Sequence, residues 1–197
     1  ERGGAKVDVV GAEEKGAVAR LTKLLADAAK TSSEPLWLVL LGHGTWNGTD
    51  AKFNLRGDDI TADALAAALK PFERPVVVVC GFSASGAFLA PLSGKGRVVV
   101  TATRAGGENN YSRFGGYFAE AIGDAASDLD KDGQTSLLEA FVAASRETAD
   151  FYKGEGRLAT EHSLLDDNGD EAGTPGDWFR GVRAVRKPSG KAESDGT

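Results

Sequence analysis

Two glycine-flanked segments carry a histidine and a serine with the chemistry of a base and its nucleophile. His43 lies in a Gly-His-Gly segment after the apolar run 36–41, and Ser83 lies in a Gly-Phe-Ser-Ala-Ser-Gly segment after the run 75–80. An imidazole accepts the proton of a hydroxyl that attacks a carbonyl carbon. The small Gly44 lets a substrate approach its backbone N–H, which helps to polarise the carbonyl oxygen. These residue types favour a hydrolase.

A third segment, 128–139, has the pattern of a twelve-residue calcium loop. Carboxylates stand at its positions 1, 3, 5 and 12, and glycine stands at position 6, where the loop must turn sharply. The predicted ligands are Asp128, Asp130, Asp132, Gln134 and Glu139. Because the loop has no paired partner, we expect structural calcium that clamps the helix beginning near Ser136. A metal-free acidic capping loop is the alternative. A second acidic stretch, 166–170, has Glu171 where the calcium loop needs its glycine and has no glutamate at the twelfth position. It is predicted to be a solvated turn.

The elements that position these residues are predicted to form an α/β fold. Three continuous apolar runs, 36–41, 75–80 and 97–102, are typical of parallel strands that helices cover on both faces. Helices are predicted at 12–30, 114–122 and 137–148. Another helix is predicted to begin after the N-cap Thr61 and to bury Leu65 and Leu69. A weaker strand is predicted at 6–10. Strands and helices in alternation predict a mainly parallel sheet flanked by helices.

The ends of the three runs are expected to meet at one edge of that sheet. In such folds the site lies at the carboxyl ends of the strands. His43, Ser83 and Arg104 each follow one of the runs. We therefore expect all three at one cleft, with Trp46 and Tyr111 as candidate groove residues.

The two histidine and serine motifs together resemble the legumain and caspase type of cysteine peptidases, and bacterial legumain-like domains above all. In that family one strand ends in His-Gly, and about 40 residues later a second strand ends in Cys-x-Ser-Gly. Here Ser83 stands at the cysteine position. The similarity covers roughly residues 6–165 and implies a caspase-like three-layer sandwich that cleaves peptide bonds.

Carried over by position, the resemblance implies a role for each matching residue. His43 is the general base, Ser83 occupies the place of the nucleophile, and the amides of Gly44 and Ser83 form the oxyanion hole. Arg104 lies near the substrate pocket. Legumain-type enzymes carry an acidic residue two places before the nucleophile, and Gly81 stands there instead, so the resemblance does not extend to asparagine specificity.

The serine leaves several interpretations open. A thiol ionises far more readily than a hydroxyl, which needs an oriented base. Ser83 therefore fits a serine variant, a pseudoenzyme that binds peptides without cleaving them, or a replaced cysteine. A serine esterase of the α/β-hydrolase type is a further alternative, with Ser83 as nucleophile, His162 as base and Asp166, Asp167 or Asp170 beside it. Cys80 lies inside an apolar run and is predicted to be an inert buried thiol.

Composition narrows the class of protein. The chain has 197 residues, of which 41% are hydrophobic and 26% charged, with a net charge of -6. These values predict one globular domain over residues 1–186 and a disordered tail at 187–197. The acidic balance argues against nucleic acid, and no apolar run approaches the roughly 20 residues of a membrane span. The expected partner is a peptide or protein substrate.

Cysteine and methionine usage bear on processing and compartment. Cys80 is the single cysteine, so an intrachain disulfide is excluded. The chain contains no methionine and starts at Glu1, which predicts a piece of a longer protein. Isolated calcium loops are typical of extracellular modules, which favours a secreted or periplasmic location. Oligomeric state is not predicted.

Overall fold

A computed structural model describes residues 5–11, 15–31 and 33–179 of the chain. The helices are α1 (Ala17–Thr31), α2 (Ala62–Leu69), α3 (Leu89–Leu92), α4 (Phe114–Ala121) and α5 (Leu137–Gly154). The strands are β1 (Leu36–Trp46), β2 (Ala51–Asn54), β3 (Ile60–Thr61), β4 (Val76–Phe82), β5 (Arg97–Thr101), β6 (Leu164–Asp166) and β7 (Thr174–Pro175). Single 3₁₀ turns lie at Ser85–Phe88, Ala125–Ser127 and Gly176–Phe179.

The strands form one mixed sheet in the order β3-β2-β1-β4-β5-β6-β7. The α/β class expected from the sequence is confirmed, but the expectation of a mainly parallel sheet is wrong. Among the described residues only the β1–β4 and β4–β5 pairs are parallel, and the four outer pairs are antiparallel. The outer strands are two to four residues long and carry no long apolar run, so their pairing left no clear signal in the sequence.

The β1–β4 pair is the part of the sheet that sets the positions of the motifs. The two strands pair in parallel from Leu36 with Val76 to Gly42 with Phe82. One step beyond the last pair stand His43 on β1 and Ser83 after β4. β1 continues past the predicted run as far as Trp46, because residues 43–46 pair antiparallel with β2.

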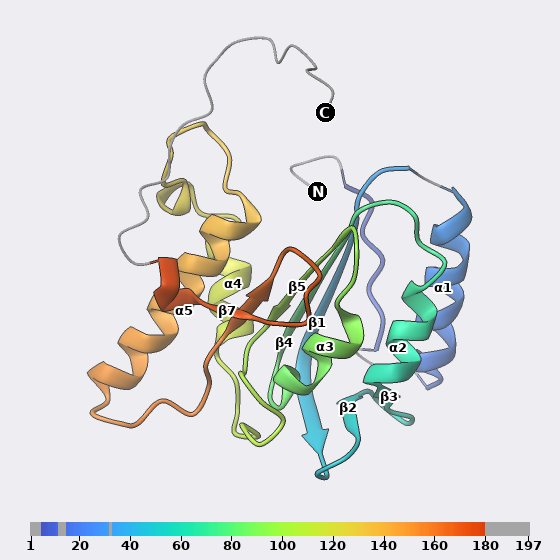
Figure 1. Cartoon of the computed structure of the whole chain (residues 1–197), viewed down its shortest axis with the longest axis horizontal. Helices are drawn as coiled ribbons and strands as arrows, with labels where there is room; N and C mark the ends of the chain where they lie inside the picture. Colours follow the sequence, from blue (N-terminus) through green and yellow to red (C-terminus); the bar gives the residue numbers. More distant parts are fainter. Residues whose placement is uncertain (1–4, 12–14, 32, 180–197) are drawn as a thin grey trace.

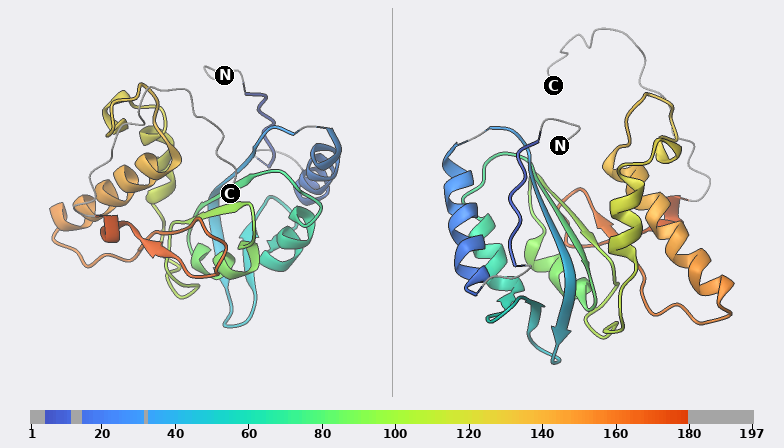
Figure 2. Two further views of the ribbon diagram at one scale, coloured as in Figure 1. Left: turned by 45° about the horizontal axis from the view of Figure 1, so that its top comes forward. Right: turned by 180° about the vertical axis from the view of Figure 1, so that it is seen from behind.

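Helices flank both faces of the sheet. In Figure 1, α1 and α2 stand on one side of the strands, and α4 and α5 stand on the other; the two further views agree (Figure 2). The predicted N-cap Thr61 accepts a hydrogen bond from the Ala64 N–H and starts α2, and Leu65 and Leu69 are fully buried. Phe82, Leu65 and Leu21 belong to the core under α1 and α2. Phe114, Phe118 and Phe141 belong to the core under α4 and α5.

One face of β1 departs from the sequence prediction of a strand buried on both sides. Leu38 and Leu40 face the core under α1 and α2, whereas Trp37, Val39 and Leu41 are 45%, 46% and 52% exposed. They alternate with the buried residues and therefore lie on the face where α4 and α5 pack. The neighbouring β4 and β5 contribute the buried Val79 and Val100 to that second core, so the helices cover those strands and leave β1 open.

Most of the predicted helices are confirmed, and α5 is longer than expected.

Residues 6–10 form no strand: Val7 and Val9 are exposed, and Val10 alone packs against the first core. The predicted tail at 187–197 lies outside the described residues. Within the described part of the chain, no helix combines the length and apolarity that crossing a membrane requires.

Two adjacent glycines of α4 provide a test of this packing. A Cβ at Gly115 would lie 2.6 Å from the Gly81 carbonyl oxygen and 2.9 Å from Leu41, whereas a Cβ at Gly116 would meet nothing within 4 Å. We expect Gly115→Ala to lower the free energy of unfolding by about 1–3 kcal/mol through overpacking. Gly116→Ala should raise it by up to about 1 kcal/mol through helix propensity. Urea denaturation measures both, and equal effects at the two positions would contradict the packing of α4 against β4.

Candidate active site

The histidine and the serine of the two motifs are in direct contact. The Ser83 hydroxyl oxygen lies 3.1 Å from Nδ1 of His43. The Gly44 N–H donates a hydrogen bond of 3.2 Å to the same oxygen. The parallel register of β1 and β4 creates this contact, because it places both motifs one residue beyond the last strand pair. The predicted grouping of His43, Gly44 and Ser83 is therefore present at the carboxyl ends of the central strands.

The single proton of the Ser83 hydroxyl has two acceptors within reach. One is Nδ1 of His43, and the other is the Gly44 carbonyl oxygen at 3.2 Å. A neutral imidazole with its proton on Nε2 accepts the serine proton at Nδ1. In the other tautomer Nδ1 donates instead, and the hydroxyl turns to the Gly44 carbonyl. The first arrangement is the one in which His43 acts as a base toward Ser83.

Position 44 has to be glycine because Ser83 and Phe82 approach its backbone closely, and not because the chain turns there. A Cβ at this position would clash with the Ser83 carbonyl oxygen and would lie 2.5 Å from the Phe82 ring. Phe82 cannot yield, because it is fully buried and packs 4.7 Å from Phe53 and 5.1 Å from Phe88 between ring centroids. The glycine therefore brings the backbone of β1 into contact with the Ser83 hydroxyl.

The turn that follows Ser83 is held by a buried polar network. Ala84 has the left-handed backbone conformation, with φ 61° and ψ 11°, which is costly for a residue with a Cβ. The Ser85 hydroxyl accepts hydrogen bonds from the N–H groups of Ala102 and Thr103 at 3.0 and 3.1 Å. The Gly86 N–H donates to the Thr103 hydroxyl at 2.8 Å. These bonds tie the serine turn to the end of β5.

Residues 104–110, which we call the strap, follow β5 and lie against this turn. The Glu108 carbonyl oxygen accepts a hydrogen bond of 2.8 Å from the Ala84 N–H. Its carboxylate accepts from the backbone N–H groups of Arg104 at 2.8 Å and His162 at 3.2 Å. Nδ1 of His162 lies 2.5 Å from the same carboxylate and must donate, because an ionised carboxylate only accepts.

Of the two predicted substrate-binding residues, Arg104 is the first residue of the strap and Trp46 packs against the strap. Arg104 is exposed, and its guanidinium lies 3.8 Å from the Glu108 carboxylate. The partly buried Trp46 packs against Gly106, where an added Cβ would lie 2.5 Å from the indole. Both residues are thus close to the serine turn. His43 is exposed, but Ser83 is fully buried.

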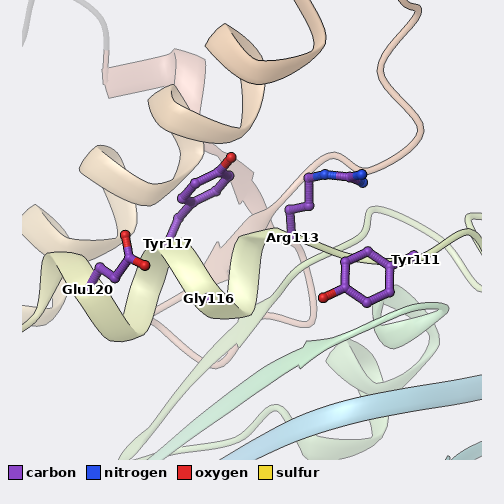
Figure 3. A pocket seen from close by; sticks show the side chains of 5 residues that line it. All are labelled: Tyr111, Arg113, Gly116, Tyr117 and Glu120. Carbon is purple, nitrogen blue, oxygen red and sulfur yellow. The ribbon is translucent and has the colours of Figure 1, made fainter. Parts of the chain in front are cut away.

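An open hollow lies at the start of α4 and in the segment before it. Its volume is about 270 Å³, and its lining residues are Tyr111, Arg113, Gly116, Tyr117 and Glu120 (Figure 3). The Arg113 guanidinium stacks over the rings of Phe151 and Tyr111, at 4.1 and 5.4 Å from their centroids. The hollow includes neither His43 nor Ser83, so we locate the chemistry by the hydrogen bonds at Ser83 and not by this concavity. Tyr111, the other candidate groove residue, belongs to it.

Cys80 lies in the core and takes no part in this arrangement. It stands inside β4, paired with Leu40, and is fully buried. Burial raises the pKa of its thiol far above the ordinary value, so the reactive thiolate is strongly disfavoured. The geometry agrees with the prediction of an inert thiol.

The predicted calcium loop brings together three of its five expected ligands. Carboxylate oxygens of Asp128, Asp130 and Glu139 lie within 4.8 Å of one another, and the Asp132 carboxylate is not part of this group. Asp132 and Gln134 are both exposed. Gly133 has the expected positive φ of 91°, and its N–H donates to Asp128 at 3.0 Å.

Glu139 at the end of the loop is also a helix cap. It forms a capping box with Ser136 at the start of α5 and accepts the N–H groups of Leu129 and Asp130. Burial alone would raise its pKa, but these hydrogen bonds stabilise the carboxylate and lower the pKa below its ordinary value. The loop therefore has a second role that the sequence analysis weighed as the alternative to metal binding.

The residues of the esterase alternative do not converge on Ser83. His162 bonds Glu108. Asp166 accepts the Ser93 hydroxyl at 2.5 Å and the Gly169 N–H at 2.8 Å, and Asp170 accepts the Ala172 N–H. The stretch 166–170 is thus a turn organised by carboxylate-to-backbone bonds; Asp167, Asn168 and Asp170 are exposed as predicted, but Asp166 is buried, contrary to the prediction of a solvated turn.

Two glutamates that shape the region were missed by the sequence analysis. Glu108 organises the strap, and Glu161 is a fully enclosed cap of α4 that accepts the N–H groups of Arg113 and Phe114 and the hydroxyl of Ser112. Their partners are up to 54 positions away in the chain. The adjacency of Glu161 to one of the two histidines was the only signal that the sequence offered.

Comparison with known proteins returns no match of this chain to a family model, to a curated protein or to a solved structure. The resemblance to legumain-type peptidases therefore rests on the two sequence motifs.

The Ser85 network gives a stability test that is independent of catalysis. Ser85→Ala leaves the N–H groups of Ala102 and Thr103 without their acceptor in a fully buried setting. We expect the free energy of unfolding to fall by about 1–3 kcal/mol. Thr22→Ala, which removes an exposed hydroxyl-to-carbonyl bond in α1, should change it by less than about 0.5 kcal/mol. A Ser85 variant as stable as the parent would contradict the network.

Proposed function

We propose that this domain is a hydrolase that cleaves peptide bonds through Ser83 and His43. The observation that carries the proposal is the 3.1 Å contact between the Ser83 hydroxyl oxygen and Nδ1 of His43, with the Gly44 N–H 3.2 Å from the same oxygen. A nucleophile within hydrogen-bond reach of its base is the arrangement that acyl transfer requires. The peptide as substrate class comes from the motif resemblance.

The residues perform the reaction in two halves. The Ser83 oxygen attacks the carbonyl carbon while its proton passes to Nδ1 of His43. The family resemblance assigns to the amides of Gly44 and Ser83 the stabilisation of the charge on the carbonyl oxygen. The C–N bond then breaks as His43 returns the proton to the leaving amine, which leaves an ester on Ser83. A water molecule attacks this ester and gives its proton to His43. His43 then returns a proton to the Ser83 oxygen as the ester C–O bond breaks, which releases the carboxylic acid and restores the serine hydroxyl and the neutral imidazole.

A serine nucleophile requires a better oriented base than a cysteine nucleophile would. His43 has to take a proton from a group that stays protonated at neutral pH, which usually requires that the base be oriented by a third group. Turnover is therefore expected to be slow with serine and faster with a thiol at the same position. The alternative function is a peptide-binding domain without turnover, and it differs in this chemical step.

Hydrolysis should be measured with blocked fluorogenic peptides that vary the residue before the cleaved bond. We expect Ser83→Cys to exceed the parent, and Ser83→Ala and His43→Ala each to lose about 10³-fold or more. Binding of the same peptides is measured in parallel by fluorescence anisotropy.

The outcomes separate the candidate functions. Activity in the cysteine form alone indicates a cysteine peptidase whose nucleophile is replaced. Peptide binding that survives Ser83→Ala, with no turnover in any form, overturns the hydrolase in favour of the binding domain. Fluorophosphonate labelling of Ser83 that requires His162 and not His43 overturns it in favour of the esterase.

We also propose that the loop 128–139 holds a structural calcium ion. The proposal is supported by the convergence of Asp128, Asp130 and Glu139 and by the conformation of Gly133. Carboxylate oxygens are the ligands that calcium prefers. A bound ion would relieve the repulsion among these groups and join the loop to the first turn of α5.

Calcium at millimolar concentration should raise the melting temperature, and Asp128→Ala should abolish the rise. Because binding to the folded state alone stabilises it by mass action, the shift should grow with calcium concentration. Asp167→Ala, in the second acidic stretch, is the matched control and should retain the shift. An equal shift in both variants, or with potassium at the same ionic strength, would contradict a specific site.

A further inference from the structure

The strap runs from the end of β5 to contacts with the turn after Ser83 and with Trp46. β4 lies between β1 and β5 in the sheet. Gly106, which follows β5, nevertheless packs against Trp46 at the end of β1. To reach it the strap has to pass above the end of β4, where Ser83 stands. Ser83 is fully buried there, although a nucleophile has to be reached by its substrate.

The two ends of the strap are held in different ways. At its start, Ala105 and Arg104 are pressed against Gly86 so closely that a Cβ on that glycine would clash with their backbone. Farther along, the strap is held by Glu108: its carbonyl takes the Ala84 N–H, and its carboxylate takes both the N–H and the Nδ1–H of His162. The first end is held by close packing together with hydrogen bonds at Arg104 and Ala105, and the second is held by the polar bonds of Glu108.

Most residues of the strap are exposed and do not pack in the core. Gly106 is its one buried residue, Glu108 is partly buried, and the other five are exposed. Segments with few buried apolar contacts open locally at low free-energy cost. The bonds of Ser83 to His43 and Gly44 join β1 to the end of β4 and do not involve the strap, so they persist when it moves.

We propose that the strap is a movable cover over Ser83, with Glu108 and His162 as its latch. In the closed state described here the latch shuts the serine away from substrate. Release of Glu108 from His162 and from the Ala84 N–H uncovers a hydroxyl already paired with its base. The use of this cover as a control of turnover rests on the function proposed above, whereas the opening itself does not.

Access to position 83 can be measured without any substrate. In a Ser83→Cys background, iodoacetamide alkylation is followed by peptide mass mapping. Cys80 stays in place as an internal control, because its burial means that it reacts only on global unfolding. We expect Glu108→Gln and, separately, His162→Ala to raise the alkylation rate at position 83 about tenfold, since a charge-assisted bond is lost. Glu120→Gln on α4 is the matched control and should leave the rate unchanged.

A second readout removes the effect of charge on thiol reactivity. Trp37 and Trp178 are 45% and 74% exposed, so Trp37→Phe with Trp178→Phe leaves Trp46 as the reporter of the strap. Acrylamide quenching of Trp46 should increase in Glu108→Gln. Rates of alkylation are compared at their high-pH limit, where the thiol is fully ionised in every variant.

The results distinguish the cover from the proposed activity. Faster alkylation and stronger quenching support the cover even where no variant hydrolyses a peptide, and in that case only the hydrolase is overturned. Unchanged alkylation and unchanged quenching in both latch variants, with circular dichroism showing a folded chain, overturn the cover. Alkylation of Cys80 at the same rate as position 83 overturns it as well, because the opening is then global.

Discussion

The structure of the site depends on the parallel pairing of β1 with β4. Seven residues of β1 pair in sequence with β4, ending at Gly42 with Phe82. That register alone decides that His43 and Ser83 stand side by side, since a shift of one residue would turn one of them to the opposite face of the sheet. The Gly44 backbone fits against Ser83 only without a Cβ. Strand pairing, core packing of Phe82 and the polar contacts at Ser83 are therefore one coupled arrangement.

The hydrogen bonds of the turn after Ser83 supply the second constraint on the site. Ser85 resembles a residue of a peptidase motif, yet in this chain its hydroxyl has a mechanical role: it accepts two backbone N–H groups at the end of β5. Gly86 then allows the chain after β5 to pack closely. The strain of the left-handed Ala84 is held by these bonds and by the Glu108 carbonyl. A motif that is associated with chemistry thus also builds the junction between two strands.

The sequence predicted the central strands, most helices and the meeting of His43 with Ser83, because each depended on local patterns and on one rule about strand ends. It failed where long-range packing decides. The apolar run of β1 predicts burial on both sides, but whether a helix covers Trp37, Val39 and Leu41 depends on where α4 and α5 settle. The short strands β6 and β7 pair antiparallel, and no apolar run in the sequence predicts them. Glu108 and Glu161 act on partners that are remote in the chain, so no local pattern marks them.

The uncovered face of β1 bears on how the protein behaves at high concentration. Three large apolar side chains in a row on a strand, all about half exposed, form the kind of surface on which copies of a chain adhere to one another. Replacing Val39 with lysine would add charge to that row, on the opposite side of the strand from the buried Leu38 and Leu40 and several residues before His43. Solubility in this fold is therefore open to adjustment on the exposed face of β1, away from the core residues Leu38 and Leu40.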